Sequence, residues 1–340
     1  MIYKGDIYHM KELIEDKVYS LTSLIKFSES PLEFINLFKI YLTKRGNLTI
    51  KIMNSNILVN KDNVHGFIRL VRNLSRCDVN EEILSIFIKD KLSINEIINN
   101  EHVLQLLKAL CIIKKLNAKV EDLGNKALID LPDTKWLIRK NTASWDLLQG
   151  PLLPYLHEPY EYSNWFYKKL SHVSCFVDIG ANIGGYSVRA CINNPYVDVY
   201  SFEPDPENYN ILTTNLSLNK CNRAKTYDLA LGDSNAILPL YQPDITHMGS
   251  LSLCREGILR GYVTVKPLDE VLNLESPCIV KIDVEGFELK VLKGMVNNLS
   301  KIKFLIIETN DKDTITKFLN KYGFKLVDHH SINYFYARRK

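Results

Sequence analysis

The sequence has 340 residues, of which 46% are hydrophobic and 24% are charged, so it can bury a full core in one large domain with a smaller one beside it. The net charge of +4 is small and its basic excess is spread over residues 1–150, which argues against a nucleic-acid-binding face. No apolar run approaches the length of a membrane span, and Met1 to Lys17 mixes acidic and basic residues early, unlike a signal peptide. We therefore expect a globular, cytoplasmic protein.

The seven cysteines are scattered, odd in number, and form neither a CxxC pair nor a His/Cys cluster. This pattern predicts reduced, buried thiols and no structural zinc site. The cysteines are Cys77, Cys111, Cys175, Cys191, Cys221, Cys254 and Cys278.

The N-terminal region, residues 1–150, is predicted to form a mainly helical accessory domain that contains a β-hairpin. Apolar residues repeat with helical spacing over 32–41, and 48–52 and 57–59 alternate as two strands around an Asn-Ser-Asn turn. Further helices are expected over 64–74, 81–89 and 94–116. Such a domain would cover the mouth of a substrate site or form a homodimer contact.

Residues 136–167 are rich in aromatic side chains with polar groups and are interrupted by glycine and proline. Aromatic faces stack on apolar sugar faces while carboxylates accept hydrogen bonds from hydroxyls, so the segment could line the site of a sugar or another hydroxyl acceptor. The alternative is that these aromatic residues dock the N-terminal domain onto the rest of the protein.

The stretch Cys175 to Ser187 reads CFVDIGANIGGYS, an apolar strand that ends in an aspartate and opens into a glycine-rich turn before a helix. Gly180 and Gly184 allow the backbone to bend sharply and to approach a ligand closely. Three residues separate these glycines, so the spacing differs from the G-x-G-x-x-G of dinucleotide sites and favours a smaller adenosine-type ligand. The next strand ends in Glu203, where a carboxylate can bind ribose hydroxyls.

Strands and helices then alternate to the C-terminus, which predicts a doubly wound α/β sheet with helices on both faces over residues 151–340. Strands are expected at 175–179, 197–203, 225–231, 279–284, 303–308, 324–328 and 333–337. Helices are expected at 185–192, 206–219, 287–297 and 313–322.

Several short motifs occur in a fixed order along this half: DIGANIG at 178–184, FEP at 202–204, ALGD at 230–233, and KIDVEGFE at 281–288, followed by LKG at 292–294. In these residues the chain resembles the FkbM-type S-adenosylmethionine-dependent methyltransferases, over roughly residues 160–340. The resemblance implies a class I, Rossmann-like, seven-stranded sheet with one antiparallel strand near the C-terminus. It also implies S-adenosylmethionine as the cofactor.

For that cofactor, the turn with Gly180, Asn182 and Gly184 would cradle the methionine and ribose portions. Asp178 would bind the ammonium group directly or through water, and Glu203 would hold the ribose diol with its two oxygens. Glu203 could instead serve as a partner for the dipole of the next helix. Asp233 could meet the adenine amine or form an Asx-type turn, and the sequence leaves both open.

The catalytic candidates are Asp283, Glu285 and His247. Asp283 and Glu285 end a central strand at the sheet edge where ligands bind, so one could act as a general base and the other could orient the acceptor hydroxyl. His247 lies in a polar, glycine-containing loop and could act as a base near neutral pH, although loop histidines are often only solvated. Glu308 is a weaker candidate, and no metal site is expected because no third ligand has suitable spacing.

The sequence thus predicts O-methylation of a hydroxyl on a sugar, glycan or small metabolite. Methylation of RNA or protein stays open because a fold does not fix the acceptor. An NAD-type oxidoreductase and a non-catalytic nucleic-acid-binding adaptor are the remaining alternatives.

Overall fold

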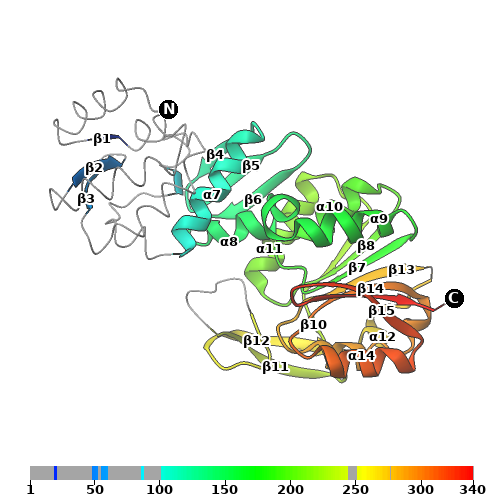
Figure 1. Ribbon diagram of the computed structural model, residues 1–340. Helices are drawn as coiled ribbons and strands as arrows, with labels where there is room; N and C mark the ends of the chain where they lie inside the picture. Colours follow the sequence, from blue (N-terminus) through cyan, green and yellow to red (C-terminus); the bar gives the residue numbers. More distant parts are fainter. Residues whose placement is uncertain are drawn as a thin grey trace, which may run out of the picture. The chain divides into compact units, whose positions relative to one another are not determined.

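The computed structural model describes residues 19–20, 48–52, 55–59, 86–87, 101–243, 251–275 and 277–339 (Figure 1). The chain divides into two compact units, Met1–Asp122 and Leu123–Lys340. Residues 123–150, which the sequence analysis grouped with the N-terminal region, thus belong to the same compact unit as the large sheet. Among the described residues, no helix combines the length and apolar character needed to cross a membrane.

The first unit contains the β-hairpin expected from the sequence. β2 (Leu48–Ile52) pairs antiparallel with β3 (Ser55–Val59), which confirms that prediction, and the short β1 (Tyr19–Ser20) pairs with β2 in parallel. Helix α7 (Glu101–Lys115) and strand β4 (Lys119–Leu123) follow. The helices expected at 32–41 and 64–74, and most of the one at 81–89, lie outside the described residues.

The second unit opens with a hairpin that was not predicted, β5 (Lys126–Asp130) and β6 (Lys135–Arg139), and with helix α8 (Ala143–Gln149). Asn215 and Asn219 attach the hairpin to a later helix, because their side-chain oxygens accept hydrogen bonds from the β6 backbone at 2.7 and 2.8 Å. The hairpin is therefore fixed by side-chain amides, those of the buried Asn215 and the partly exposed Asn219, which strand periodicity does not reveal.

A seven-stranded sheet forms the centre of this unit, in the order β15-β16-β14-β13-β7-β8-β9. β16 pairs antiparallel with both β14 and β15, and the other neighbouring pairs are parallel. This order confirms the predicted doubly wound sheet with one antiparallel strand near the C-terminus. The strands are β7 (Cys175–Ile179), β8 (Asp198–Phe202), β9 (Ala224–Tyr227), β13 (Cys278–Ile282), β14 (Ile302–Glu308), β15 (Phe324–His330) and β16 (Asn333–Arg338).

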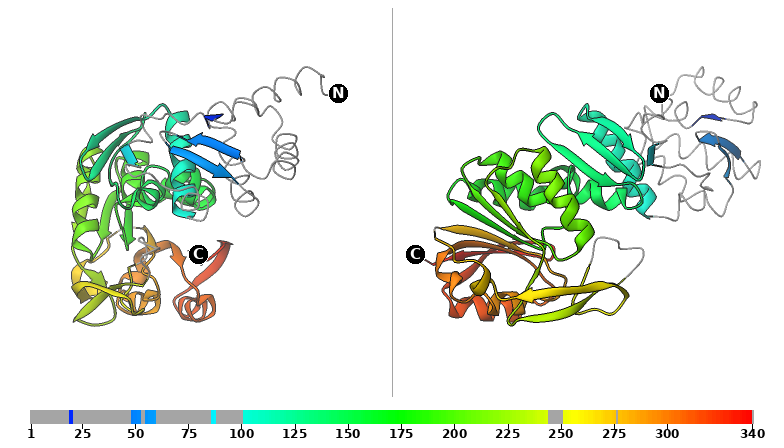
Figure 2. Two further views of the ribbon diagram at one scale, coloured as in Figure 1. Left: turned by 90° about the vertical axis from the view of Figure 1, so that its left-hand side faces the viewer. Right: turned by 180° about the vertical axis from the view of Figure 1, so that it is seen from behind.

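Helices cover the two faces of the sheet, as the ribbon views show (Figures 1 and 2). Because side chains alternate along a strand, Phe176 joins a core with the helix residues Tyr186 and Ala190, whereas Val177 joins the opposite core with Val291 and Leu319. The helices are α9 (Tyr167–Leu170), α10 (Gly185–Asn193), α11 (Pro206–Leu218), α12 (Leu268–Val271), α13 (Glu288–Lys293), the 3-10 turn η3 (Asn298–Lys301) and α14 (Lys312–Lys321).

A second, three-stranded sheet holds β10 (Ala230–Leu231), β12 (Ile258–Lys266) and β11 (Ala236–Gln242) in that order. The sequence predicted one strand over 225–231, but the chain leaves the large sheet after Tyr227 and joins the small one at Ala230. The interruption falls at Asp228 and Leu229, a break that apolar patterning alone did not indicate.

The aromatic segment packs mostly against the large sheet. It contains two π-helical turns, η1 (Leu153–His157) and η2 (Glu161–Phe166). Phe166 and Trp165 belong to the core on the α10 face, where Trp165 lies 4.9 Å from Phe335 between ring centroids. These two side chains therefore stabilise the fold of the second unit.

Two disulfides join cysteines that both lie in the described part of the chain, and Cys111 is disulfide-bonded as well, so the prediction that all cysteines are reduced is wrong. Cys175 on β7 is bonded to Cys278 on β13, and Cys191 is bonded to Cys221. Cys175 and Cys278 are direct neighbours in register on adjacent strands, although 103 residues separate them in the sequence. Spacing along the chain could not reveal this proximity. Cys254 is a free, exposed thiol.

Candidate active site

A cavity of about 230 Å³ lies where β7, β8, β13 and β14 reach their carboxyl ends. Ligands of open α/β sheets bind at this edge. Five of the predicted site residues line the cavity with fifteen others, one of which is the weaker candidate Glu308. The lining is Trp145, Gln149, Ile179, Gly180, Asn182, Phe202, Glu203, Pro204, Asn208, Leu229, Ala230, Leu231, Leu240, Leu251, Leu253, Asp283, Val284, Glu285, Phe287 and Glu308.

Gly180 lies in the turn after β7, and any other residue there would force the neighbouring backbone to shift. Its φ of +82° lies in the left-handed region, and a Cβ built on it would lie 1.9 Å from the backbone oxygen of Asp283. The backbone N–H of Asp283 donates to the carbonyl oxygen of Ile179, one residue before the glycine. The absence of a side chain at Gly180 therefore lets the ends of β7 and β13 meet beneath the cavity.

Glu203 follows β8 and organises the opposite side of the turn. One of its oxygens accepts a hydrogen bond from the N–H of Asn182 at 2.8 Å, and the other accepts from the N–H of Asp205 at 3.0 Å. Burial raises the pKa of Glu203 to about 7, and these backbone hydrogen bonds oppose that rise. The Asn208 side-chain amide also donates to the second oxygen, at a long 3.5 Å. A carboxylate has about four acceptor positions, so the two oxygens remain suited to a vicinal diol.

Asp178 lies in the protein interior next to the cavity and is not part of its lining. Its side chain is buried and accepts a hydrogen bond from the Ser187 hydroxyl at 2.5 Å. Burial raises the pKa of Asp178 to about 6, while Ser187 and the neighbouring Lys281 oppose the rise. Asp178 thus connects β7 to the first turn of α10.

The other predicted cofactor residues take different positions. Asn182 lines the cavity with a left-handed φ of 51°. Gly184, with a φ of 97°, is the residue that precedes α10 and packs against Leu212, outside the lining. Asp233 is exposed after β10 and also lies outside the lining, where the neighbouring Asn235 donates a hydrogen bond to Glu270.

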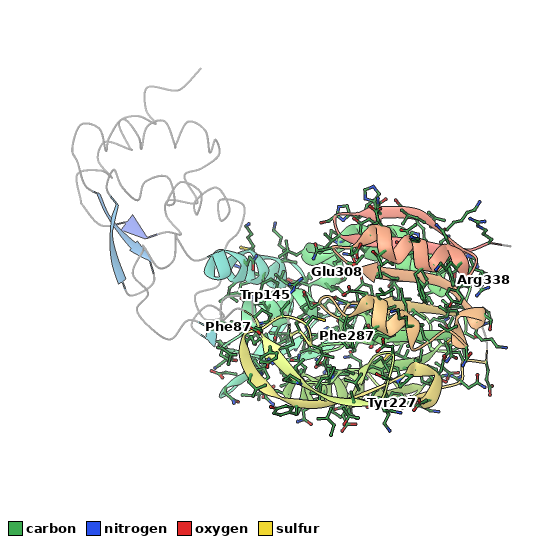
Figure 3. All side chains as sticks on the ribbon, turned by 90° about the horizontal axis from the view of Figure 1, so that it is seen from below. Phe87, Trp145, Tyr227, Phe287, Glu308 and Arg338 are labelled. Carbon is green, nitrogen blue, oxygen red and sulfur yellow. A yellow bond between two sulfur atoms is a disulfide. The ribbon has the colours of Figure 1, made fainter. Side chains whose placement is uncertain are left out.

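One part of the cavity wall is apolar and was missed by the sequence analysis. It includes Phe287, which precedes α13, and Trp145 from α8, as well as leucines from the small sheet. Phe287 and Trp145 come from different elements, and both line the cavity near Glu308 (Figure 3). Only the aromatic richness of residues 136–167 pointed towards Trp145, and no pattern singled out Leu251 or Leu253.

Asp283 and Lys281 form an ion pair at the end of β13. The Lys281 ammonium donates a hydrogen bond to Asp283 at 2.9 Å, and the exposed fractions of the two side chains are 3% and 24%. Burial lowers the pKa of Lys281, but Asp283, Glu158 and Glu308 outweigh it and the net pKa is raised. Lys281 is therefore a permanent positive charge beneath the cavity.

Glu285 sits in a tight turn with a left-handed φ of 51°, and its carboxylate lies 3.5 Å from the Arg255 guanidinium. Its backbone oxygen accepts a hydrogen bond from the Ser252 hydroxyl at 2.9 Å. Asp283, Glu285 and Glu308 also line a second cavity of about 130 Å³. The three carboxyls thus border both cavities.

Glu308 ends β14, the strand next to β13, and belongs to the same site. The charge of Asp283 and burial raise the pKa of Glu308 well above its usual range, and Lys281 only partly opposes this. The sequence analysis ranked Glu308 below Asp283 and Glu285, because the pairing of β13 with β14 was needed to bring these carboxyls together.

His247 lies outside the described residues, so its position relative to the cavity is not part of the site described here. Within the ranges that the structure describes, no three His, Cys, Asp or Glu side chains are grouped so that they could hold a metal ion.

Comparison with known proteins identifies a related family. The model of the "Methyltransferase FkbM domain" matches residues 178–326. The hexuronic acid methyltransferase AglP of Haloferax volcanii is 33% identical over 152 residues, which cover 42% of this chain and 60% of that protein. The methyltransferase sdnD of Sordaria araneosa is 30% identical over 168 residues, with coverages of 39% and 65%.

The chain thus spans about three fifths of the length of these curated relatives. A solved structure, precorrin-6y C5,15-methyltransferase from Geobacter metallireducens, matches with a TM-score of 0.31 and 14% identity, over 49% of this chain and 80% of that one. At that TM-score the likeness adds nothing to the fold, which follows from the strand order given above.

Proposed function

Because the model of the FkbM methyltransferase domain matches residues 178–326, we propose that this protein transfers the methyl group of S-adenosylmethionine to a hydroxyl group. The proposed acceptor is a sugar, a glycan or a small metabolite. The observation that carries the proposal is the cavity at the carboxyl ends of the central strands, which joins a glycine turn, a strand-end carboxylate and an apolar wall.

The residues present fit the chemistry of this cofactor. Gly180 occupies a position that a Cβ would block, so the floor of the cavity is made of backbone. Glu203 offers two carboxylate oxygens for the ribose hydroxyls, and Asn182 places its backbone beside them. Phe287 and the leucines provide an apolar surface of the kind that an adenine ring requires.

The bound donor would supply a methyl group already activated by a sulfonium. The protein then needs to align an acceptor oxygen and to accept its proton. Asp283, Glu285 and Glu308 border both cavities, so one of them can reach a hydroxyl group that enters beside the cofactor. Lys281 donates a hydrogen bond to Asp283 and holds its carboxyl in position at the cavity.

A sugar acceptor is supported by the name of one relative, the hexuronic acid methyltransferase AglP. The carboxyls at the cavity suit hydroxyl-bearing ligands, because a carboxylate accepts hydrogen bonds from hydroxyls. RNA and protein acceptors are the alternatives within methyl transfer, and an NAD-type reaction or nucleic-acid binding are the alternatives outside it.

The test uses S-adenosylmethionine with a radiolabelled methyl group, the purified protein, and a panel of neutral sugars, uronic acids, glycans, RNA and protein. We expect label in a carbohydrate or small-metabolite product, and none when Glu203→Ala replaces the wild-type protein. Thermal shift with S-adenosylhomocysteine and with NAD runs in parallel. Stabilisation by NAD alone, or labelling of RNA or protein alone, would contradict the proposal.

A further inference from the structure

Glu308 is placed to receive a proton from a ligand. It lines both cavities, and neither of its oxygens accepts a hydrogen bond from any residue that the structure describes. By contrast, the carboxyl of Glu203 is engaged by two backbone N–H groups and that of Asp283 by Lys281. The Glu285 carboxylate lies 3.5 Å from Arg255, so among the cavity carboxyls named here Glu308 is the one whose oxygens accept no hydrogen bond from a described residue.

The charges around Glu308 favour its neutral form while the cavity holds no cation. Asp283 raises the pKa of Glu308 most, burial adds to the effect, and Glu158 and Glu285 add smaller contributions. Lys281 opposes them, but its hydrogen bond goes to Asp283. Glu288 accepts a hydrogen bond from Thr309, the residue after β14, and burial raises its pKa as well. The site thus holds more carboxyls than the charge of Lys281 can balance.

We propose, on the basis of the function proposed above, that Glu308 is the proton carrier of this site. Glu308 holds a proton in the free protein, releases it when the positively charged methyl donor binds, and accepts the proton of the acceptor hydroxyl during methyl transfer. A positive charge within about 4–6 Å of a carboxyl lowers its pKa by roughly 1–3 units, which is the size of change that this release requires.

The resulting cycle balances in atoms and charge. Glu308 first gives its proton to solvent. During transfer the O–H bond of the acceptor breaks and its proton goes to Glu308, a new O–CH3 bond forms, and the electron pair of the broken S–CH3 bond remains on sulfur. Glu308 is then protonated beside the neutral thioether product, which is the state in which it began. Binding of the donor therefore prepares the base, and release of the product needs no proton exchange.

The experiment is calorimetric titration with S-adenosylmethionine and with S-adenosylhomocysteine, each at about pH 8 in two buffers of different ionisation enthalpy, which gives the number of protons released. The two ligands share adenine, ribose, carboxylate and ammonium groups, so the difference between them reports on the sulfonium alone. We expect the wild-type protein to release up to about one more proton with S-adenosylmethionine than with S-adenosylhomocysteine. Glu308→Gln should still bind both and abolish the difference.

Glu288→Gln is the matched control, because Glu288 is a buried carboxyl with a raised pKa that lines the second cavity and not the cofactor cavity. It should retain the proton difference. Equal proton counts for the two ligands with the wild-type protein, or a difference that persists in Glu308→Gln, would overturn the role of Glu308 and leave cofactor binding intact. Absence of binding by both ligands would instead overturn the proposed function, and the role of Glu308 with it.

Discussion

The two halves of the cavity are held by different kinds of interaction. On the side of β7 and β8, Gly180 and Glu203 set the backbone, and the Glu203 carboxyl is held by two N–H groups. On the side of β13 and β14, the interactions are between charged side chains, with Lys281 paired to Asp283 and Glu308 next to them. The first half suits binding in a fixed geometry, and the second suits exchange of protons.

This difference predicts how substitutions on each side should change the affinities for the two ligands. Substitutions in the β7–β8 half should weaken the binding of S-adenosylmethionine and of S-adenosylhomocysteine equally, because the groups bound there are common to both ligands. Changes in the β13–β14 half should alter the ratio of the two affinities, because only one ligand carries a positive sulfonium.

The largest effect is expected from Gly180→Ala. Its Cβ would meet the Asp283 backbone at 1.9 Å with φ at +82°, so we expect a loss of about 4 kcal/mol or more in the free energy of unfolding. Gly323→Ala is the matched control, since Gly323 has a φ of +83° but its Cβ would meet only the end of Arg338 at 4.0 Å. It should lower the free energy of unfolding by about 1 kcal/mol, measured by urea denaturation. Equal losses would show that the close contact at Gly180 is unimportant.

The second largest loss in the free energy of unfolding is expected from Lys281→Met. It leaves the carboxyls of Asp283 and Glu308 without their buried positive charge, so a loss of about 3 kcal/mol is expected. Lys135→Met removes an ion pair with Asp130 whose side chains are 49% and 36% exposed, and it should change the same free energy by less than about 1 kcal/mol. A Lys281→Met protein as stable as the wild type would contradict the charge arrangement described here.

Asp205→Ala tests the β7–β8 half of the cavity, and its expected effect on stability is smaller. Asp205 caps α11 by accepting hydrogen bonds from the N–H groups of Glu207 and Asn208, both at 3.0 Å, so about 1–2 kcal/mol of stability should be lost. Asp311→Ala removes the corresponding cap of α14, where the Asp311 carboxylate accepts a hydrogen bond from the N–H of Thr314 at 3.2 Å. The Asp205 N–H donates to Glu203 and is retained in Asp205→Ala, but the lost cap no longer holds this turn in place, so we expect only Asp205→Ala to weaken binding of S-adenosylhomocysteine as well.

The smallest effect is expected from Arg255→Ala. The Arg255 side chain is 47% exposed and lies 3.5 Å from Glu285, so its removal should change the free energy of unfolding by less than about 0.5 kcal/mol. A loss several times larger in the same denaturation series would mean that Glu285 depends on Arg255 for its position.

The sequence allowed the central strands β7, β13 and β14 to be predicted because each is a compact, mostly apolar run with a clear end, such as Phe176 to Ile179 before Gly180. It did not reveal the small sheet, because β10 is only two residues long and lies close behind β9. The turn, Glu203 and Asp283 were found from local motifs. Glu308, Trp145 and the two disulfides depend on which strands and helices become neighbours, and local patterns carry no such information.

The central claim is that the cavity binds the adenosine-containing cofactor through Glu203. The most direct measurement is calorimetric titration of the wild-type protein and of Glu203→Gln with S-adenosylhomocysteine. We expect micromolar binding by the wild type and binding about 10² weaker by the variant, since the amide offers one acceptor oxygen where the carboxylate offers two. No binding by the folded wild-type protein, or equal affinity in the two proteins, would contradict it.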